Sequence, residues 1–413
     1  MKIAVIALLS VVSLDLMNQA LVFPILNTIV MDPAHGILPE HTTVAERHLD
    51  FGLLMGAFFL CWFLGAAYIS KISDFIGRKE GILICLAGNF LGYALVIVAL
   101  ELSSFWLLLF ARALSGFTAG NQPIAQAALI DISESDQQKT RYMGLILLAV
   151  SVGLVAGPLI GGLLSDKAVL GRYASVELPF YCAAGMVFIS LTLILMFFHN
   201  KRTERQPFEF KPLQVFLTLW EACKRPVILK LSLVFFFGQL SLNACYVFMS
   251  NYYYSRFQFD TLQNSIALVI LGVGLGFGSS FLVGPITARF SKIKIISTCL
   301  ALMGVSVLLS IVNPSPFFAY VLVLPFIIPF SIYFPAMMTL FSLAVSDSEQ
   351  GWVMGVSVAL YTLGAGLVAL VGGELMSISI HLPFMIAVGS SVIALMLILT
   401  LWRGADIRVL DRK

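Results

Sequence analysis

The chain has 413 residues, of which 59% are hydrophobic and only 11% are charged, whereas about a quarter of the residues of a soluble protein are charged. A soluble fold cannot bury that much apolar surface, so the composition excludes an ordinary soluble protein. The formal charge of +3 is small, and we expect no nucleic-acid partner.

Apolar runs recur along the chain, and each is long enough to cross the roughly 30 Å hydrocarbon layer as a helix of about 20 residues. We predict an all-α membrane protein with twelve transmembrane helices in two six-helix halves. The first six are expected near Ile3 to Leu26, Phe51 to Ser70, Gly81 to Leu100, Ser104 to Ile130, Tyr142 to Ser165 and Leu178 to Phe198. The second six are expected near Val227 to Tyr254, Asn264 to Ala288, Ile295 to Val312, Pro316 to Leu343, Trp352 to Ser377 and Leu382 to Trp402.

The first predicted helix carries an acid at depth. Asp15 interrupts the apolar run and no small-residue cleavage site precedes Asp32, so we interpret the segment as a membrane helix and not as a signal peptide. Asp15 lies ~18 Å along the helix from Ile3, near the middle of the hydrocarbon core. An acid there costs about 2.5 to 3.5 kcal/mol, so we expect it to face a cavity or a partner. Asn18 and Gln19 flank it and are predicted to bind substrate.

The fourth predicted helix holds an arginine deep in its span. Helical spacing places Arg112, Gly116, Pro123 and Gln126 on one face. Because a charge in the membrane interior is costly, we predict that Arg112 acts with Asp15 in proton coupling. Gln126 is predicted to bind substrate.

The fifth predicted helix contains a glycine pattern, which reads G-x8-G-x3-G-P-x2-G-G from its first to its last glycine. Glycine at every fourth residue makes a stripe where another helix can approach closely, and we expect that helix to be the eighth. The alternative is ordinary small-residue packing. We predict conformational roles for the residues of the pattern, which are Gly144, Gly153, Gly157, Pro158, Gly161 and Gly162.

A polar stretch separates the two predicted halves. We divide the chain into an N-terminal half at 1–198, a cytoplasmic linker at 199–226, a C-terminal half at 227–403 and a cytoplasmic tail at 404–413. Lysine and arginine are retained on the cytoplasmic side. With both termini inside, the outside loops hold only four basic residues, Arg47, Lys167, Arg172 and Arg256. We therefore predict a multi-pass protein of the bacterial inner membrane with both termini in the cytoplasm.

The seventh predicted helix carries Gln239, Asn243 and Tyr246 at spacings of four and three residues, which place them on one face. We predict that they bind substrate. The alternative, for these amides and for those of the first and fourth helices, is that they only hydrogen-bond one helix to another.

The eleventh predicted helix repeats the fifth. Met143-Gly144, Gly153, Gly161 and Gly162 recur at a constant displacement as Met354-Gly355, Gly364, Gly372 and Gly373. Two six-helix halves repeated in parallel are a transporter architecture.

Several of these motifs resemble those of one family. The pattern from Gly144 to Gly162 resembles the antiporter signature in helix five of the major facilitator superfamily. The loop Ser70-Lys-Ile-Ser-Asp74-Phe-Ile-Gly77-Arg78-Lys79 is similar to its signature between helices two and three, except at Ser70 and Phe75. Asp15, the run Arg112-Ala-Leu-Ser-Gly116 and Asp131 resemble the tetracycline/proton antiporter branch of drug:proton antiporters.

The resemblance implies proton-driven exchange of a hydrophobic or amphipathic solute on a major facilitator fold. It also implies conformational roles for Asp74, Gly77 and Arg78, with Asp74 as a latch against the positive end of helix eleven, worth roughly 0.3 to 1 kcal/mol. The alternative is that this segment is a solvated loop.

We predict a proton-coupled secondary transporter that exports a small amphipathic solute or drug by alternating access. Its expected partners are a small-molecule substrate, protons and membrane lipid, and we expect a monomer. An enzyme is not expected, because the sequence lacks a nucleotide-binding glycine loop and a nucleophile elbow. We also predict no cofactor and no metal site, since the spacing of His35, His41 and His48 is irregular. The alternatives are a proton-coupled importer of a siderophore or metabolite and a non-transporting receptor.

Overall fold

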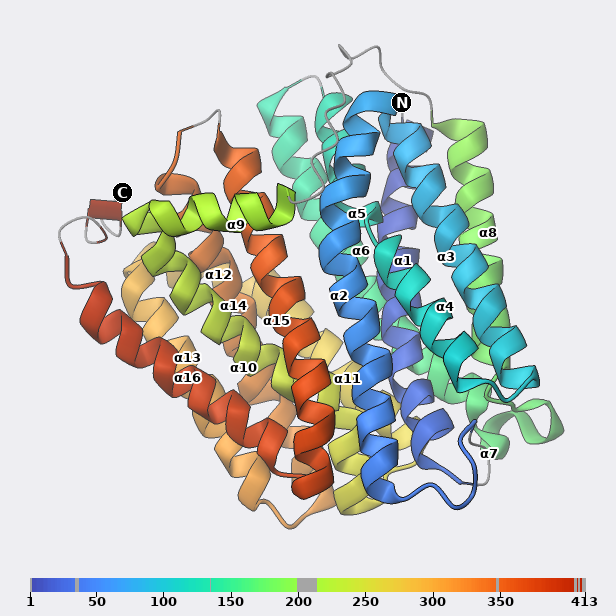
Figure 1. Ribbon diagram of the computed structural model, residues 1–413. Helices are drawn as coiled ribbons and strands as arrows, with labels where there is room; N and C mark the ends of the chain where they lie inside the picture. Colours follow the sequence, from blue (N-terminus) through green and yellow to red (C-terminus); the bar gives the residue numbers. More distant parts are fainter. Residues whose placement is uncertain are drawn as a thin grey trace. The chain divides into compact units, whose positions relative to one another are not determined.

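In the computed structural model the described residues, 2–33, 37–133, 135–198, 214–346, 349–404, 407 and 409–410, form helices and their connections (Figure 1). The first helices are α1 (Lys2–Met31), α2 (Val44–Ile76), α3 (Arg78–Glu101), α4 (Phe105–Phe117), α5 (Asn121–Asp131), α6 (Asp136–Ser165), α7 (Lys167–Leu170) and α8 (Leu178–Phe197). The later ones are α9 (Gln214–Lys224), α10 (Pro226–Phe257), α11 (Thr261–Phe277), α12 (Val283–Arg289), α13 (Lys292–Val312), α14 (Pro316–Leu343), α15 (Gln350–Ile378) and α16 (Leu382–Leu401). The predicted all-α class is confirmed.

Eleven helical segments within the described ranges are long and apolar enough to cross a membrane. The fourth predicted helix, Ser104 to Ile130, is instead two short helices, because α4 ends before Thr118 and Gly120 precedes α5. Glycine has a low helix propensity, and Pro123 has no N–H to donate to the carbonyl four residues earlier. These two residues account for the break.

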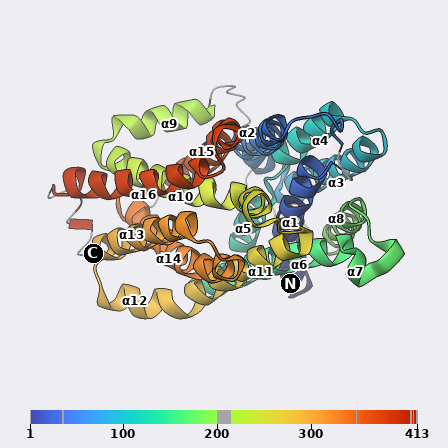
Figure 2. The same ribbon diagram turned by 90° about the horizontal axis from the view of Figure 1, so that it is seen from below.

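The chain divides into two compact units. Unit 1 comprises Met1–Lys211 with Gln258–Gly272, and unit 2 comprises Pro212–Phe257 with Val273–Lys413. The start of α11 therefore groups with unit 1 and its end with unit 2. The long helices of each unit lie side by side (Figures 1 and 2).

In unit 1, α1 packs against α6 through the glycine stripe. A methyl group added at Gly153 or Gly157 would collide with the backbone of α1, and one added at Gly161 would lie 3.0 Å from the Leu21 carbonyl oxygen. Glycine is needed there because two helix backbones approach closely. The expectation that the stripe faces the eighth helix is wrong: α11 meets the neighbouring position Gly162, through Ser265.

Unit 2 repeats this arrangement with α15 and α10. Gly364 and Gly372, the counterparts of Gly153 and Gly161, both face α10, where their nearest neighbours are the side chains of Phe236 and Phe248. In this half aromatic rings fill the space that the backbone of α1 fills in unit 1. The sequence repeat thus corresponds to a repeated helix pairing.

In each unit an arginine, buried in unit 1 and partly buried in unit 2, donates hydrogen bonds to the end of a helix. Arg47, which is 2% exposed, donates to the carbonyl oxygens of Val30 at 2.7 Å and Pro39 at 3.1 Å. Arg256 donates to the carbonyl oxygens of Ile311 at 2.5 Å and Asn313 at 2.7 Å. Carbonyl groups in the last turn of a helix have no partner within the helix, so the arginines satisfy the ends of α1 and α13.

Candidate functional site

Asp15 lies on α1 and is 6% exposed. Its Oδ1 atom accepts hydrogen bonds from two amides, Asn89 Nδ2 on α3 at 3.2 Å and Asn121 Nδ2 on α5 at 3.1 Å. Both amides are buried. A carboxylate with donors is the partnered arrangement expected of an acid in the membrane interior.

Two residues beside the break between α4 and α5 take part in this network. Thr118, the residue after α4, donates through its hydroxyl to Asn89 Oδ1 at 3.2 Å, and Asn121 is the first residue of α5. Thr118 thereby holds the Asn89 amide with its N–H group toward Asp15.

Arg112 is 4% exposed and lies on α4. Its guanidinium carbon is 4.3 Å from the centre of the Phe58 ring on α2, a distance that favours a cation–π interaction. Its Nε atom is buried without a hydrogen-bond partner. No ion pair joins Arg112 to Asp15 among the residues that the structure describes; the acid is held by amides and the arginine by an aromatic ring.

The residues predicted to bind substrate fall into two groups. Asn18, Gln239 and Asn243 are each at most 2% exposed, and none of their amide atoms has a hydrogen-bond partner within the described chain. Gln19, Gln126 and Tyr246 are partly buried. The amides of the first group therefore form no hydrogen bond between helices within the described residues, and their donors and acceptors stay available. An unpaired buried amide is costly, which favours a ligand as its partner.

The loop signature forms a tight connection between α2 and α3. Gly77 has φ +124°, a conformation that favours glycine. Arg78, the first residue of α3, donates from Nε to Asp131 at 3.1 Å and from Nη1 to the Ser73 hydroxyl at 3.1 Å. The side chain of Asp74, and with it the predicted latch, lies outside the described part of the structure.

The remaining predicted residues give no further site. Gly144 and Pro158 lie within α6. Across the described ranges no group of three or more metal-ligating side chains lies together, and His35 of the first outside loop falls outside those ranges.

Sequence reasoning missed three residues of the Asp15 network, namely Asn89, Thr118 and Asn121. Asn89 and Asn121 are amides within apolar spans, like Asn18, and that signal was available. The missing information was the tertiary packing that brings the amides of Asn89 and Asn121 to Asp15.

A comparison with known proteins shows the family of this chain. The family model of the major facilitator superfamily matches residues 8–291 and 266–411. The chain belongs to the major facilitator superfamily.

Several known transport and resistance proteins are similar to this chain. The chain is 27% identical to the tetracycline resistance protein, class C, of Escherichia coli, over 87% of this chain and 86% of that protein. It is 26% identical to the quinolone resistance protein NorA of Staphylococcus aureus, over 85% and 87% of the two chains. The human organic anion transporter MFSD10 has the same fold, with a TM-score of 0.72 at 20% identity, over 96% and 99% of the chains. This superfamily protein is therefore a multi-pass secondary transporter of small molecules and not an enzyme.

Proposed function

We propose that this superfamily member is a proton-coupled antiporter that exports a small amphipathic solute or drug from the bacterial cytoplasm. The observation that carries the proposal is the buried carboxylate of Asp15, held by two amide donors on other helices. The similarity to resistance proteins for tetracycline and quinolones supports export of a drug-like substrate.

In this proposal the two carboxylate oxygens of Asp15 have different roles. Both N–H donors point at Oδ1, so its lone pairs are occupied. Oδ2 receives no hydrogen bond from the described residues and is the atom that takes the proton. Hydrogen bonds to the charged form of an acid favour that form. An access state that moves α3 or α5 away from α1 removes the donors and favours the protonated acid.

Arg112 contributes a fixed positive charge in the same unit. Its guanidinium is held by Phe58 on α2 and not by an acid, so its distance from Asp15 changes when α2 and α4 move relative to α1. Proton and substrate need not touch, because each ligand shifts the equilibrium only through its different affinities for the two access states.

The substrate is bound by neutral hydrogen-bonding groups. Within unit 1 the buried amide of Asn18 has no hydrogen-bond partner among the described residues, and within unit 2, taken by itself, the same holds for Gln239 and Asn243. They offer donors and acceptors in apolar surroundings, which suits an amphipathic solute whose polar groups must be satisfied during transport. Both termini and the 199–226 linker lie in the cytoplasm in this proposal, and the protein acts as a monomer.

The experiment uses proteoliposomes loaded with tetracycline and then given a pH gradient of either sign. An antiporter releases tetracycline faster when the outside is acidic and accumulates it when the inside is acidic. A proton-coupled importer shows the opposite dependence. If neither tetracycline nor a fluoroquinolone responds to the gradient, the proposed substrate class is wrong.

A further inference from the structure

A short helix outside the transport machinery exposes an apolar side. α9 has 11 residues, or ~16 Å of helix, too short to cross a membrane. Leu217 is 52% exposed, Trp220 is 62% exposed and Phe216 is 51% exposed. At 100° per residue the three side chains fall within about 100° of the helix circumference.

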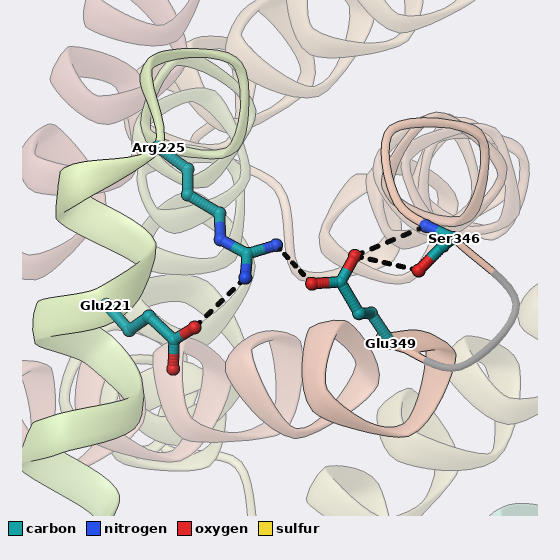
Figure 3. Close-up of polar contacts among 4 residues, drawn as sticks. All are labelled: Glu221, Arg225, Ser346 and Glu349. Carbon is teal, nitrogen blue, oxygen red and sulfur yellow. Dashed lines mark hydrogen bonds and ion pairs between the residues drawn. The ribbon is translucent and has the colours of Figure 1, made fainter.

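The opposite sides of α9 are already occupied. Val215 and Ala222 are buried, and α9 packs on α10 and α15 of the same unit. Arg225, which follows α9, donates to Glu221 at 3.0 Å and to Glu349 at 2.7 Å, as Figure 3 shows.

Further contacts hold the polar edge of α9 and thereby set the direction in which its apolar side faces. Glu349 accepts a further hydrogen bond from the Ser346 hydroxyl at 2.9 Å, and the Arg225 guanidinium carbon lies 4.4 Å from the centre of the Trp352 ring. The polar edge of α9 is thus attached to the connection between α14 and α15. Figure 1 shows α9 lying across the end of α10, so its axis is transverse to a helix that spans the membrane.

We infer that α9 lies in the membrane surface, with Leu217 and Trp220 inserted at the boundary between lipid headgroups and acyl chains. α9 ends two residues before the spanning helix α10 begins at Pro226, so it is at the depth where a span meets water. The Lys224 ammonium lies 5.7 Å from the centre of the Trp220 ring. Tryptophan and a lysine that extends toward the headgroups are typical of this depth.

Apolar contact, and not charge, holds α9 in the lipid. Arg225 is neutralised by Glu221 and Glu349, which leaves Lys224 as the basic side chain at the apolar side. Affinity of an interfacial helix is the sum of buried apolar area and attraction to anionic lipid. The attraction to anionic lipid is small here, so the insertion depth of α9 does not depend on the fraction of anionic lipid.

The test places a nitroxide label on α9 in the full-length chain, with the native cysteines replaced by alanine. The chain is reconstituted in vesicles of phosphatidylethanolamine and phosphatidylglycerol. Phe216→Cys carries the label on the apolar side, and Glu221→Cys, about 140° away around the helix, is the matched control on the polar edge. The collision rates with oxygen, which concentrates in acyl chains, and with a water-soluble nickel chelate are measured for each label.

The inference expects a higher ratio of oxygen to nickel collisions at Phe216→Cys than at Glu221→Cys, and the same ratio in vesicles without phosphatidylglycerol. Equal exposure of both labels to the nickel chelate overturns it. A Phe216→Cys label that neither reagent reaches also overturns it, because a second copy or another part of the chain then covers the helix.

A second measurement needs no cysteine replacement. Brominated phospholipids quench tryptophan that lies among acyl chains. The wild-type chain should lose more fluorescence to them than Trp220→Phe does, and identical absolute losses would contradict the inference.

Discussion

At the scale of single residues, the proposed mechanism depends on the buried acid Asp15 and its two amide donors. The need for partners around Asp15 could be predicted from its depth, because an unpartnered charge in lipid is costly. The identity of those partners could not be predicted, since Asn89 and Asn121 are distant in sequence and reach Asp15 only through tertiary packing. The pairing of Arg112 with Phe58 was unpredictable for the same reason.

Removing one amide donor should change the pH dependence of transport. A hydrogen bond to a charged group contributes about 1.5 to 3 kcal/mol, and 1.36 kcal/mol corresponds to one pH unit. Asn121→Leu should therefore raise the pH of half-maximal transport by about one to two units. The matched control is Asn27→Leu, which removes a buried amide of α1 that makes no hydrogen bond within the described residues. Equal pH profiles for the two variants would mean that Asn121 does not set the proton affinity of the site.

At the scale of elements, the sequence predicted most of the helices but missed the break before α5 and the short helix α9. The break before α5 was signalled by Gly120 and Pro123, but hydropathy alone favoured one continuous span. α9 lies inside the predicted linker at 199–226, where eleven residues were too few to stand out as a span. The glycine stripe was predictable as a close contact, whereas its partner α1 was not, because any helix can approach a row of glycines.

The close contact between α6 and α1 should not tolerate a side chain. A leucine at Gly157 would meet the backbone of α1 at Met17, and overpacking of this kind costs about 1 to 3 kcal/mol. Gly157→Leu should therefore lower the thermal unfolding temperature of the purified protein. Gly185→Leu is the matched control in the same unit, since nothing lies within 4 Å of a methyl group added there. If both variants melt together, the stripe is not a packed interface.

The attachment of α9 should weaken at acid pH. The hydrogen bond from Arg225 holds the pKa of Glu349 below its ordinary value of 4.5. The stabilisation is therefore complete above the unfolded-state pKa and is lost as the pH falls through the lower folded-state pKa. Glu349→Gln should be less thermostable than wild type at pH 7, and the two proteins should converge in acid. A difference that persists at a pH well below the pKa of Glu349 would show that charge is not its cause.

At the scale of the whole molecule, the sequence repeat predicted a repeated helix pairing, whereas the distribution of basic residues predicted an orientation that stays a prediction. The repeated glycines correspond to the paired helices α6 with α1 and α15 with α10, which is the internal repeat expected of transporters. The family match agrees with it. The substrate was not predictable, because buried amides such as Asn243 can satisfy many polar solutes.

The orientation in the membrane is open to a direct test. Reporter fusions after Lys79, at Arg205 and at the C-terminus should be active only in the cytoplasm, because basic residues concentrate in those segments. A fusion near His41 should be active only in the periplasm. An external C-terminus would reverse the proposed direction of every loop.

The central claim is that the proton moves through Asp15. The measurement is pH-gradient-driven tetracycline flux in proteoliposomes, with tetracycline binding recorded on the same protein. Asp15→Asn keeps the size of the side chain and cannot exchange a proton, so it should bind tetracycline and fail to concentrate it against a gradient. Asn27→Leu should still concentrate it. Uphill transport by Asp15→Asn at the wild-type rate would contradict the account, because the proton would then travel by another residue.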